Sequence, residues 1–276
     1  MHPEILSIKS FAASDRRPIP RSSGRGIVTS LSDRYLPFFL NLLDSLKDVG
    51  CSLPIEVWHS KSELSDKTKE ILAGRVTLRR FQDIDPYISF IRGFATKPFA
   101  ILHSNFRECL FLDADNYVIR NPEVFFNSTP YLQTGALFWE DMDNQASERG
   151  HFSDLRLALG LPAAYRQCES GQMVINRVRH WKSLVVANEI NQRATHFYKF
   201  MWGDAQSYQL AMELVNEPFS YVPKRGVFDL KIPCMVQHNL DGSEQFLHIT
   251  TAEDKFKVID GLSERLRLRA IQSRNS

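Results

Sequence analysis

The chain has few cysteines and needs none to hold its fold together. Among 276 residues there are four, Cys51, Cys109, Cys168 and Cys234, and no two have the spacing of a metal-binding motif. A chain of this length buries a core large enough to be stable without disulfides. Cys109 lies inside an apolar run and is predicted to be a packed core thiol. Cys168 and Cys234 both precede segments that carry motifs, and pairing between them is left open, since it depends on the redox compartment.

No apolar stretch approaches the roughly 20 residues that a membrane-spanning helix needs. The most apolar segment, residues 35–43, is too short and is interrupted. The first 25 residues are polar with scattered prolines, which is unlike a signal peptide. We therefore expect the chain as given to be soluble and cytoplasmic, or to lie in the Golgi lumen if it is a domain cut from an anchored protein.

The chain also lacks an excess of charge of either sign, because its net charge is only +2. Nothing global therefore points to a nucleic-acid partner. Basic residues gather only near the end of the chain, and they are expected on the solvated face of a last helix: Arg265, Arg267, Arg269 and Arg274.

Strand-like and helix-like patterns alternate through the first half of the chain. Strands are predicted over residues 26–31, 54–58, 75–79 and 108–112, and helices over 35–49, 65–72 and 97–103. Such alternation predicts an α/β, Rossmann-like fold with a mostly parallel sheet and helices on both faces. The second half is less regular, with predicted elements over 171–176, 181–194, 204–215 and 235–238. We expect one domain over residues 24–250, preceded by an extension (1–23) and followed by a C-terminal helix and basic tail (251–276).

The most informative stretch is residues 107–115, where a short apolar run ends in two carboxylates, Asp113 and Asp115. Ionised carboxylates are costly at the end of a buried strand unless they have a partner. A divalent cation bound to a diphosphate is such a partner, because hard cations share their shells between carboxylates and substrate phosphates. Ligands of parallel α/β sheets also bind at the carboxyl ends of the strands. This pair is therefore the candidate metal and nucleotide-sugar site.

Two other Asp-x-Asp pairs are weaker candidates. Asp83 and Asp85 precede a proline and are predicted to form a solvated turn. Asp141 and Asp143 follow an apolar run, but Glu140 intervenes and the segment continues into a polar loop.

Nine short segments occur in an order that carries a family resemblance. They are residues 24–28, 53–59, 97–102, 111–116, 121–123, 135–139, 169–172, 203–204 and 235–238. Together they resemble the fungal Mnn-type α-mannosyltransferases over residues 24 to 242, and a looser likeness to glycogenin-type glycosyltransferases supports the same fold. The resemblance implies a GT-A fold and a retaining transfer of a sugar, α-mannose from GDP-mannose, to a glycan acceptor with Mn²⁺ or Mg²⁺.

The resemblance also implies a metal site. Asp113 and Asp115 would hold the metal and the ribose–diphosphate region, and His238 would be the third ligand. His248 is the rival, and we expect it to be a core histidine. The metal would act as a Lewis acid that stabilises the charge growing on the departing diphosphate.

Further roles carry over to the donor. Lys97 would face the donor phosphates or the second carboxylate of the site, and Ser30 and Tyr35 would contact the base and ribose, although Tyr35 can equally be a core residue. Gln172 would bind the sugar end of the donor, and Asp141 a sugar hydroxyl.

Two carboxylates are candidates for the catalytic role that glycosyl transfer requires beside the anomeric carbon. Asp204 ranks first and Glu169 second, and Asp204 is also a predicted helix N-cap. The segment 138–141 lacks the proline that the family more often has before the aspartate, which leaves the acceptor open.

Other functions fit less well. A haloacid-dehalogenase-type phosphatase requires a small hydroxyl residue at the position of Tyr117. A sugar nucleotidyltransferase needs a glycine-rich loop after the first strand, and residues 31–34 contain no glycine. A UDP-sugar-dependent transferase of the same fold and a non-catalytic sugar- or nucleotide-binding module remain alternatives.

Overall fold

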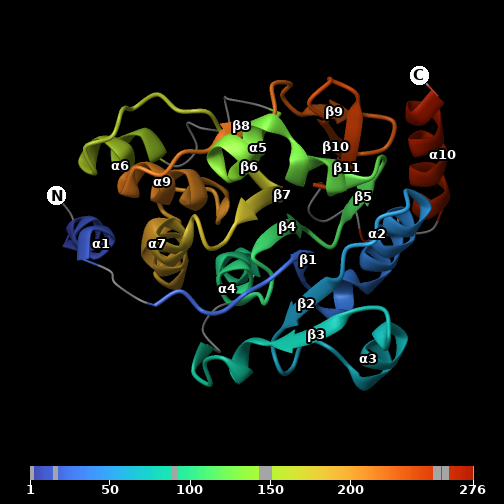
Figure 1. Ribbon diagram of the computed structural model, residues 1–276, viewed down its shortest axis with the longest axis horizontal. Helices are drawn as coiled ribbons and strands as arrows, with labels where there is room; N and C mark the ends of the chain where they lie inside the picture. Colours follow the sequence, from blue (N-terminus) through green and yellow to red (C-terminus); the bar gives the residue numbers. More distant parts are fainter. Residues whose placement is uncertain are drawn as a thin grey trace.

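A computed structural model describes residues 3–14, 18–88, 93–142, 151–250, 256 and 261–275 (Figure 1). Its main sheet has seven strands in the order β3–β2–β1–β4–β7–β6–β8. These strands are β1 (Arg25–Ser30), β2 (Ile55–His59), β3 (Thr77–Arg80), β4 (Glu108–Leu112), β6 (Ala136–Glu140), β7 (Cys168–Asn176) and β8 (Ser220–Tyr221). Only β7 runs antiparallel to its neighbours, β4 and β6. The predicted mostly parallel α/β sheet is therefore confirmed.

A second sheet of four antiparallel strands adjoins the first, in the order β5–β11–β10–β9. Its members are β5 (Asn116–Val118), β9 (Val227–Asp229), β10 (Cys234–His238) and β11 (Glu244–His248). Since β5 follows β4 after a turn of three residues, the small sheet starts where the main sheet carries its Asp-x-Asp pair. In its register His248 lies opposite Asn116, whereas His238 lies opposite Glu244.

Helices cover both faces of the main sheet (Figure 1). They are α1 (Pro3–Ser14), α2 (Leu36–Asp48), α3 (Asp66–Leu72), α4 (Thr96–His103), α5 (Thr129–Thr134), α6 (Phe152–Ala158), α7 (Trp181–Gln192), α8 (Ala194–Phe197), α9 (Ala205–Val215) and α10 (Leu262–Asn275). Short 3₁₀ turns are η1 (Asp33–Tyr35), η2 (Phe81–Asp83), η4 (Gly93–Ala95) and η5 (Pro122–Asn127). Successive strand residues point to opposite faces, so Phe111 packs with the α4, α7 and α9 side and Leu110 with the α2 side.

Local signals explain where the helices begin and end. Apolar residues recur at helical spacing along α2, and Gly50, with a φ of 68°, follows the end of that helix. Ser65 caps α3 as predicted, because its Oγ accepts a hydrogen bond from the Thr68 backbone N–H.

The two ends of the chain are more structured than an extension and a tail. Residues 3–14 form α1, whose Ile5, Ile8 and Ala12 are buried in the core with α7 and α9. The predicted last helix is present as α10, but Arg269 is not on a solvated face. It makes ion pairs with Asp229 and Glu244 and so ties α10 to the small sheet.

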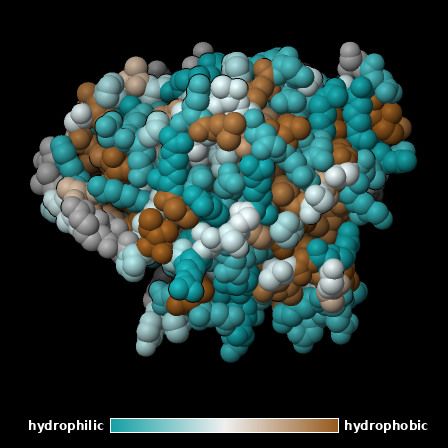
Figure 2. Space-filling model, in the orientation of Figure 1, coloured by the Kyte–Doolittle hydropathy of each residue, from teal (hydrophilic) through white to brown (hydrophobic). Residues whose placement is uncertain are grey.

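The face of the molecule in Figure 2 is mainly hydrophilic, and hydrophobic side chains are scattered over it in separate groups. Within the described ranges no helix is both long enough and apolar enough to cross a membrane. All four cysteines fall within those ranges and are free thiols, so Cys168 and Cys234 are not paired.

Candidate active site

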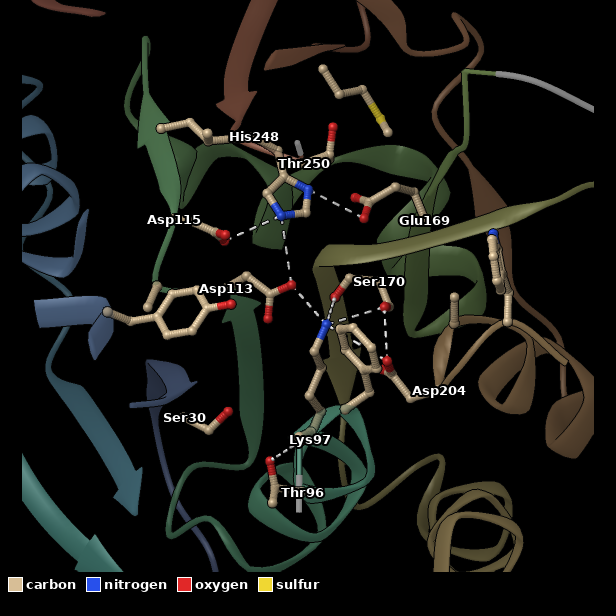
Figure 3. Close-up of a pocket in the computed structure, with 18 of the residues that line it drawn as sticks. Ser30, Thr96, Lys97, Asp113, Asp115, Glu169, Ser170, Asp204, His248 and Thr250 are labelled. Atoms are coloured by element: carbon tan, nitrogen blue, oxygen red, sulfur yellow. Dashed lines mark hydrogen bonds and ion pairs between the residues drawn. The ribbon is translucent and has the colours of Figure 1, made fainter. Parts of the chain in front are cut away.

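A cavity of about 510 Å³ opens at the carboxyl ends of β1 and β4, where the sequence predicted the chemistry. Most of the predicted site residues line it: Ser30, Tyr35, Lys97, Asp113, Asp115, Asp141, Glu169 and Asp204. Those labelled in Figure 3, among them Ser30, Lys97 and Asp204, come from segments far apart in the sequence. Gln172 and His238 do not line the cavity.

His248 lies between Asp115 and Glu169 at the cavity (Figure 3). Its Nε2 lies 3.3 Å from Asp115 Oδ1 and 3.7 Å from Asp113 Oδ2, and its Nδ1 lies 3.3 Å from Glu169 Oε1. Burial acts to lower the pKa of His248, but Glu169 and Asp115 outweigh it and raise that pKa well above its usual range. Ligand atoms of Asp113, Asp115 and His248 all lie within 4.8 Å of one another.

The predicted third ligand, His238, is not part of this group, and this prediction is corrected. His238 ends β10, where its backbone oxygen accepts a hydrogen bond from Trp139 Nε1 at 2.8 Å. Because β10 and β11 are antiparallel, His238 and His248 lie at opposite ends of the small sheet. The expectation that His248 is a core histidine was equally wrong, since it lines the cavity.

Glu169 is held by groups on three sides. Its Oε1 accepts a hydrogen bond from the Gly171 backbone N–H at 2.8 Å, and its Oε2 accepts one from Gln172 Nε2 at 2.5 Å. His248 faces the same carboxylate, and a Cβ on Gly171 would overlap the His248 imidazole. Gln172, predicted to bind the donor sugar, is fully buried, and its amide nitrogen holds Glu169.

Lys97 lies between two carboxylates of the cavity, Asp113 and Asp204. Its Nζ lies 2.7 Å from Asp113 Oδ2 and 3.7 Å from Asp204 Oδ1, and it donates to Ser170 Oγ at 3.2 Å. Burial acts to lower the pKa of Lys97, but Asp113 and Asp204 raise it above its usual range, so the ammonium stays charged. Lys97 is buried, so its ammonium faces the carboxylates of the cavity and not open solvent.

Asp204 stands at the N-cap position of α9 but makes no capping hydrogen bond with its side chain. Its Oδ1 accepts a hydrogen bond from Ser170 Oγ at 3.3 Å, and its buried Oδ2 has no hydrogen-bond partner. Burial raises the pKa of Asp204 to about 6, although Lys97 acts to lower it. Its carboxylate is therefore directed to the cavity rather than to the helix.

Several residues that line the cavity were not predicted to do so. They include Phe94, Gln167, Ser170, Trp202, Met235, His248 and Thr250. Ser170 lies between two predicted residues, and that position was the available signal. Asp141 lines the cavity, whereas Asp143 lies outside the described residues.

A known family matches most of the chain. The family described as "Mannosyltransferase putative" matches residues 24–156 and 163–230. The chain belongs to this mannosyltransferase family. The resemblance found in nine short segments is therefore confirmed, and the main sheet has the predicted mostly parallel α/β arrangement.

Relatives of this family member include fungal α-mannosyltransferases. The alpha-1,2-mannosyltransferase MNN5 of Saccharomyces cerevisiae is 23% identical in an alignment of 289 positions, and the alignment covers 82% of this chain and 49% of MNN5. The alpha-1,2-mannosyltransferase MNN24 of Candida albicans is 24% identical over 246 residues, covering 72% of this chain and 34% of MNN24. The chain thus spans between a third and a half of these relatives' length.

Solved structures of similar shape are more distant in sequence. The galactosyltransferase LgtC, in complex with donor and acceptor sugar analogs, has a TM-score of 0.49 and 12% identity, covering 71% of this chain and 73% of LgtC. Core-mannan synthase A from Aspergillus fumigatus, in a Mn/GDP form, has a TM-score of 0.48 and 10% identity, covering 80% of this chain and 77% of the synthase.

Proposed function

We propose that this chain is a retaining glycosyltransferase that moves α-mannose from GDP-mannose to a glycan acceptor with Mn²⁺ or Mg²⁺. The observation that carries the proposal is the convergence of Asp113, Asp115 and His248 beside Lys97 and Asp204 in one cavity. Membership of a mannosyltransferase family supports the reaction and the sugar.

The donor set of Asp113, Asp115 and His248 fits a divalent metal. Two carboxylates and one imidazole offer ligand atoms within 4.8 Å of one another, and such mixed oxygen and nitrogen sets suit Mn²⁺. When bound, the metal stabilises the negative charge of the departing diphosphate. Glu169 faces the second ring nitrogen of His248, which is the arrangement that orients a ligating imidazole.

The order of the strands assigns each part of the donor to a different part of the cavity. Ser30 ends β1, Tyr35 ends the η1 turn that follows it, and both are assigned to the base and ribose. Asp113 and Asp115 follow β4 in the middle, where Lys97 adds a positive charge for the phosphates. Asp204 lies beyond them, on the β7 side of the cavity, and is assigned to the sugar.

Asp204 is a better candidate than Glu169 for the catalytic carboxylate. Both oxygens of Glu169 accept hydrogen bonds from Gly171 and Gln172, so this carboxylate is committed to holding its neighbours. Asp204 has one buried oxygen without a hydrogen-bond partner, which can face the positive charge that develops at the anomeric carbon. Glu169 is therefore proposed as a positioning residue for His248.

The two histidines provide a matched pair of variants. His248→Gln is expected to weaken Mn²⁺ binding about a hundred-fold, because a ligand is lost, whereas His238→Gln is expected to leave it within about two-fold. Electron paramagnetic resonance of free Mn²⁺ measures both, and melting curves check that each variant is folded. Normal Mn²⁺ binding by His248→Gln together with loss in His238→Gln would reverse the assignment.

Thermal stability with nucleotides tests the donor. With Mn²⁺ present, GDP and GDP-mannose at about a hundred times their Kd are expected to raise the Tm by roughly 5 °C or more. UDP, UDP-glucose and UDP-galactose are expected to leave it unchanged, as is GDP after chelation of the metal. A shift with uridine nucleotides alone would replace the donor, and no shift with any nucleotide would favour a non-catalytic sugar-binding module.

A further inference from the structure

Two large aromatic side chains at the cavity are exposed. Phe94 in η4 is 62% exposed and Trp202, in the loop before α9, is 55% exposed, yet both line the same cavity as Asp204. The other three tryptophans of the chain all lie within the described ranges. Trp58 and Trp139 are fully buried, and Trp181 is 8% exposed. Trp202 is therefore an exception that the packing of the core does not explain.

The local backbone brings these rings to the sugar end of the cavity. Gly203 separates Trp202 from Asp204 and has a φ of 67°, a conformation that glycine adopts without strain. A Cβ on Gly203 would lie only 3.2 Å from the Phe94 ring, so the glycine also permits the close approach of Phe94. Lys97 Nζ lies 5.7 Å from the centroid of that ring. The Phe94 ring thus adjoins Lys97, and Trp202 lines the same cavity two residues before Asp204.

The loop that carries Trp202 is anchored before any ligand arrives. Gln206 of α9 is buried, and its Oε1 accepts a hydrogen bond from the Trp202 backbone N–H at 2.6 Å. The amide nitrogen of Gln206 donates to Gln167 Oε1 at 3.3 Å, and Gln167 lines the cavity. Asp141 lines the cavity as well and offers a carboxylate. The backbone of Trp202 is therefore held in place by a buried side chain in the free protein.

We propose that Phe94 and Trp202 form a stacking surface for a hexopyranose ring of the acceptor. A pyranose has an apolar C–H face and a polar rim, which suits exposed aromatic rings bordered by the polar groups of Asp141 and Gln167. The inference rests on the proposed function, because the donor assigned to β1 and β4 leaves the region beyond Asp204 for the acceptor.

The exposure of a single tryptophan permits a direct binding test without turnover. Iodide quenches exposed indoles, so quenching in the unaltered protein is expected to report mainly on Trp202. Methyl glycosides of mannose, glucose and galactose are the probes, each added with Mn²⁺ and GDP present. At least one of them is expected to halve the quenching constant, and Trp202→Phe is expected to remove the quenchable fraction.

Kinetics supply the second test. Trp202→Leu and Phe94→Leu keep an apolar side chain but remove the ring, and each is expected to raise the acceptor KM about ten-fold. The donor KM, Mn²⁺ binding and slow transfer to water are expected to stay within about two-fold, and Trp202→Phe is expected to recover most of the loss. Leu132→Ala is the matched control, because Leu132 is 59% exposed and does not line the cavity.

The outcomes separate this inference from the proposed function. Protection of Trp202 by GDP-mannose and Mn²⁺, with none from any glycoside, would assign the rings to the donor sugar and overturn the inference. Unchanged acceptor KM values in both leucine variants would also overturn it. Protection by a glycoside in a protein that binds no nucleotide would retain the stacking surface and reject the transferase.

Discussion

Asp115→Asn is expected to lower the rate of sugar transfer roughly a thousand-fold, since Lewis-acid stabilisation of a leaving group is worth several kcal/mol. Asp115 is buried beside His248, and a neutral amide is a poor ligand for a hard cation. Asparagine has nearly the same shape as aspartate, so the fold is expected to remain intact. Transfer rates over a Mn²⁺ titration, with circular dichroism melting curves, measure both effects.

Asp66→Asn is the control for this variant, because Asp66 is an exposed aspartate in the first turn of α3. It is expected to transfer sugar at the rate of the unaltered enzyme. Full turnover by Asp115→Asn in buffer stripped of metal would contradict the assignment of Asp115 as a ligand.

Asp204→Asn is expected to lower kcat by about two to three orders of magnitude and to change donor affinity by less than about three-fold. Its role is proposed in the transition state, where the negative charge of Asp204 faces the oxocarbenium-like centre. Lys97 keeps its 2.7 Å contact with Asp113 in the variant, so no buried cation is left unpaired. Single-turnover rates and GDP-mannose titration separate the two effects.

Glu169→Gln is the comparison for Asp204→Asn. Because Glu169 is proposed to orient His248, its replacement is expected to raise the Mn²⁺ concentration needed by about ten-fold or more. Saturating metal is expected to restore most of kcat. A large loss of kcat in Glu169→Gln at saturating metal, with near-normal turnover in Asp204→Asn, would exchange the two roles.

The sequence predicted the half of the site that depends on single elements. A buried strand followed directly by Asp113 and Asp115 is a local pattern. The arrangement of the sheet then sets the edge at which these carboxylates lie. Lys97 and Asp204 were also identified, but the resemblance rather than the residue pattern selected them. The 3.7 Å ion pair between Lys97 Nζ and Asp204 Oδ1 depends on the packing of α4 and α9 against the sheet.

The choice between the two histidines could not be made from local pattern, because each ends a short apolar strand. What decides it is pairing between distant strands. β11 lies beside β5, the strand that continues from Asp115, and the register sets His248 opposite Asn116. A sequence shows neither which strand is the neighbour nor the direction in which it runs.

Exposure was equally beyond the reach of pattern. Phe94 and Trp202 are residue types that usually lie in a core, and Gln172 is a type that usually lies on the surface. In this fold Phe94 and Trp202 are exposed, and Gln172 is buried. Gln172 is buried because β7 lies between β4 and β6, and no local sequence pattern predicts that strand order.

The pairing of β5 with β11 also makes the proposed metal site depend on a late part of the chain. β11 is the last strand in the described part of the chain, so a nascent polypeptide that has reached only β10 holds both carboxylates without their histidine. Contacts between residues far apart in sequence form slowly, because the intervening loop must close before they bring any gain. The proposed metal site would then be completed after the parallel sheet, so metal binding would report that β11 has paired with β5 rather than help the sheet to form.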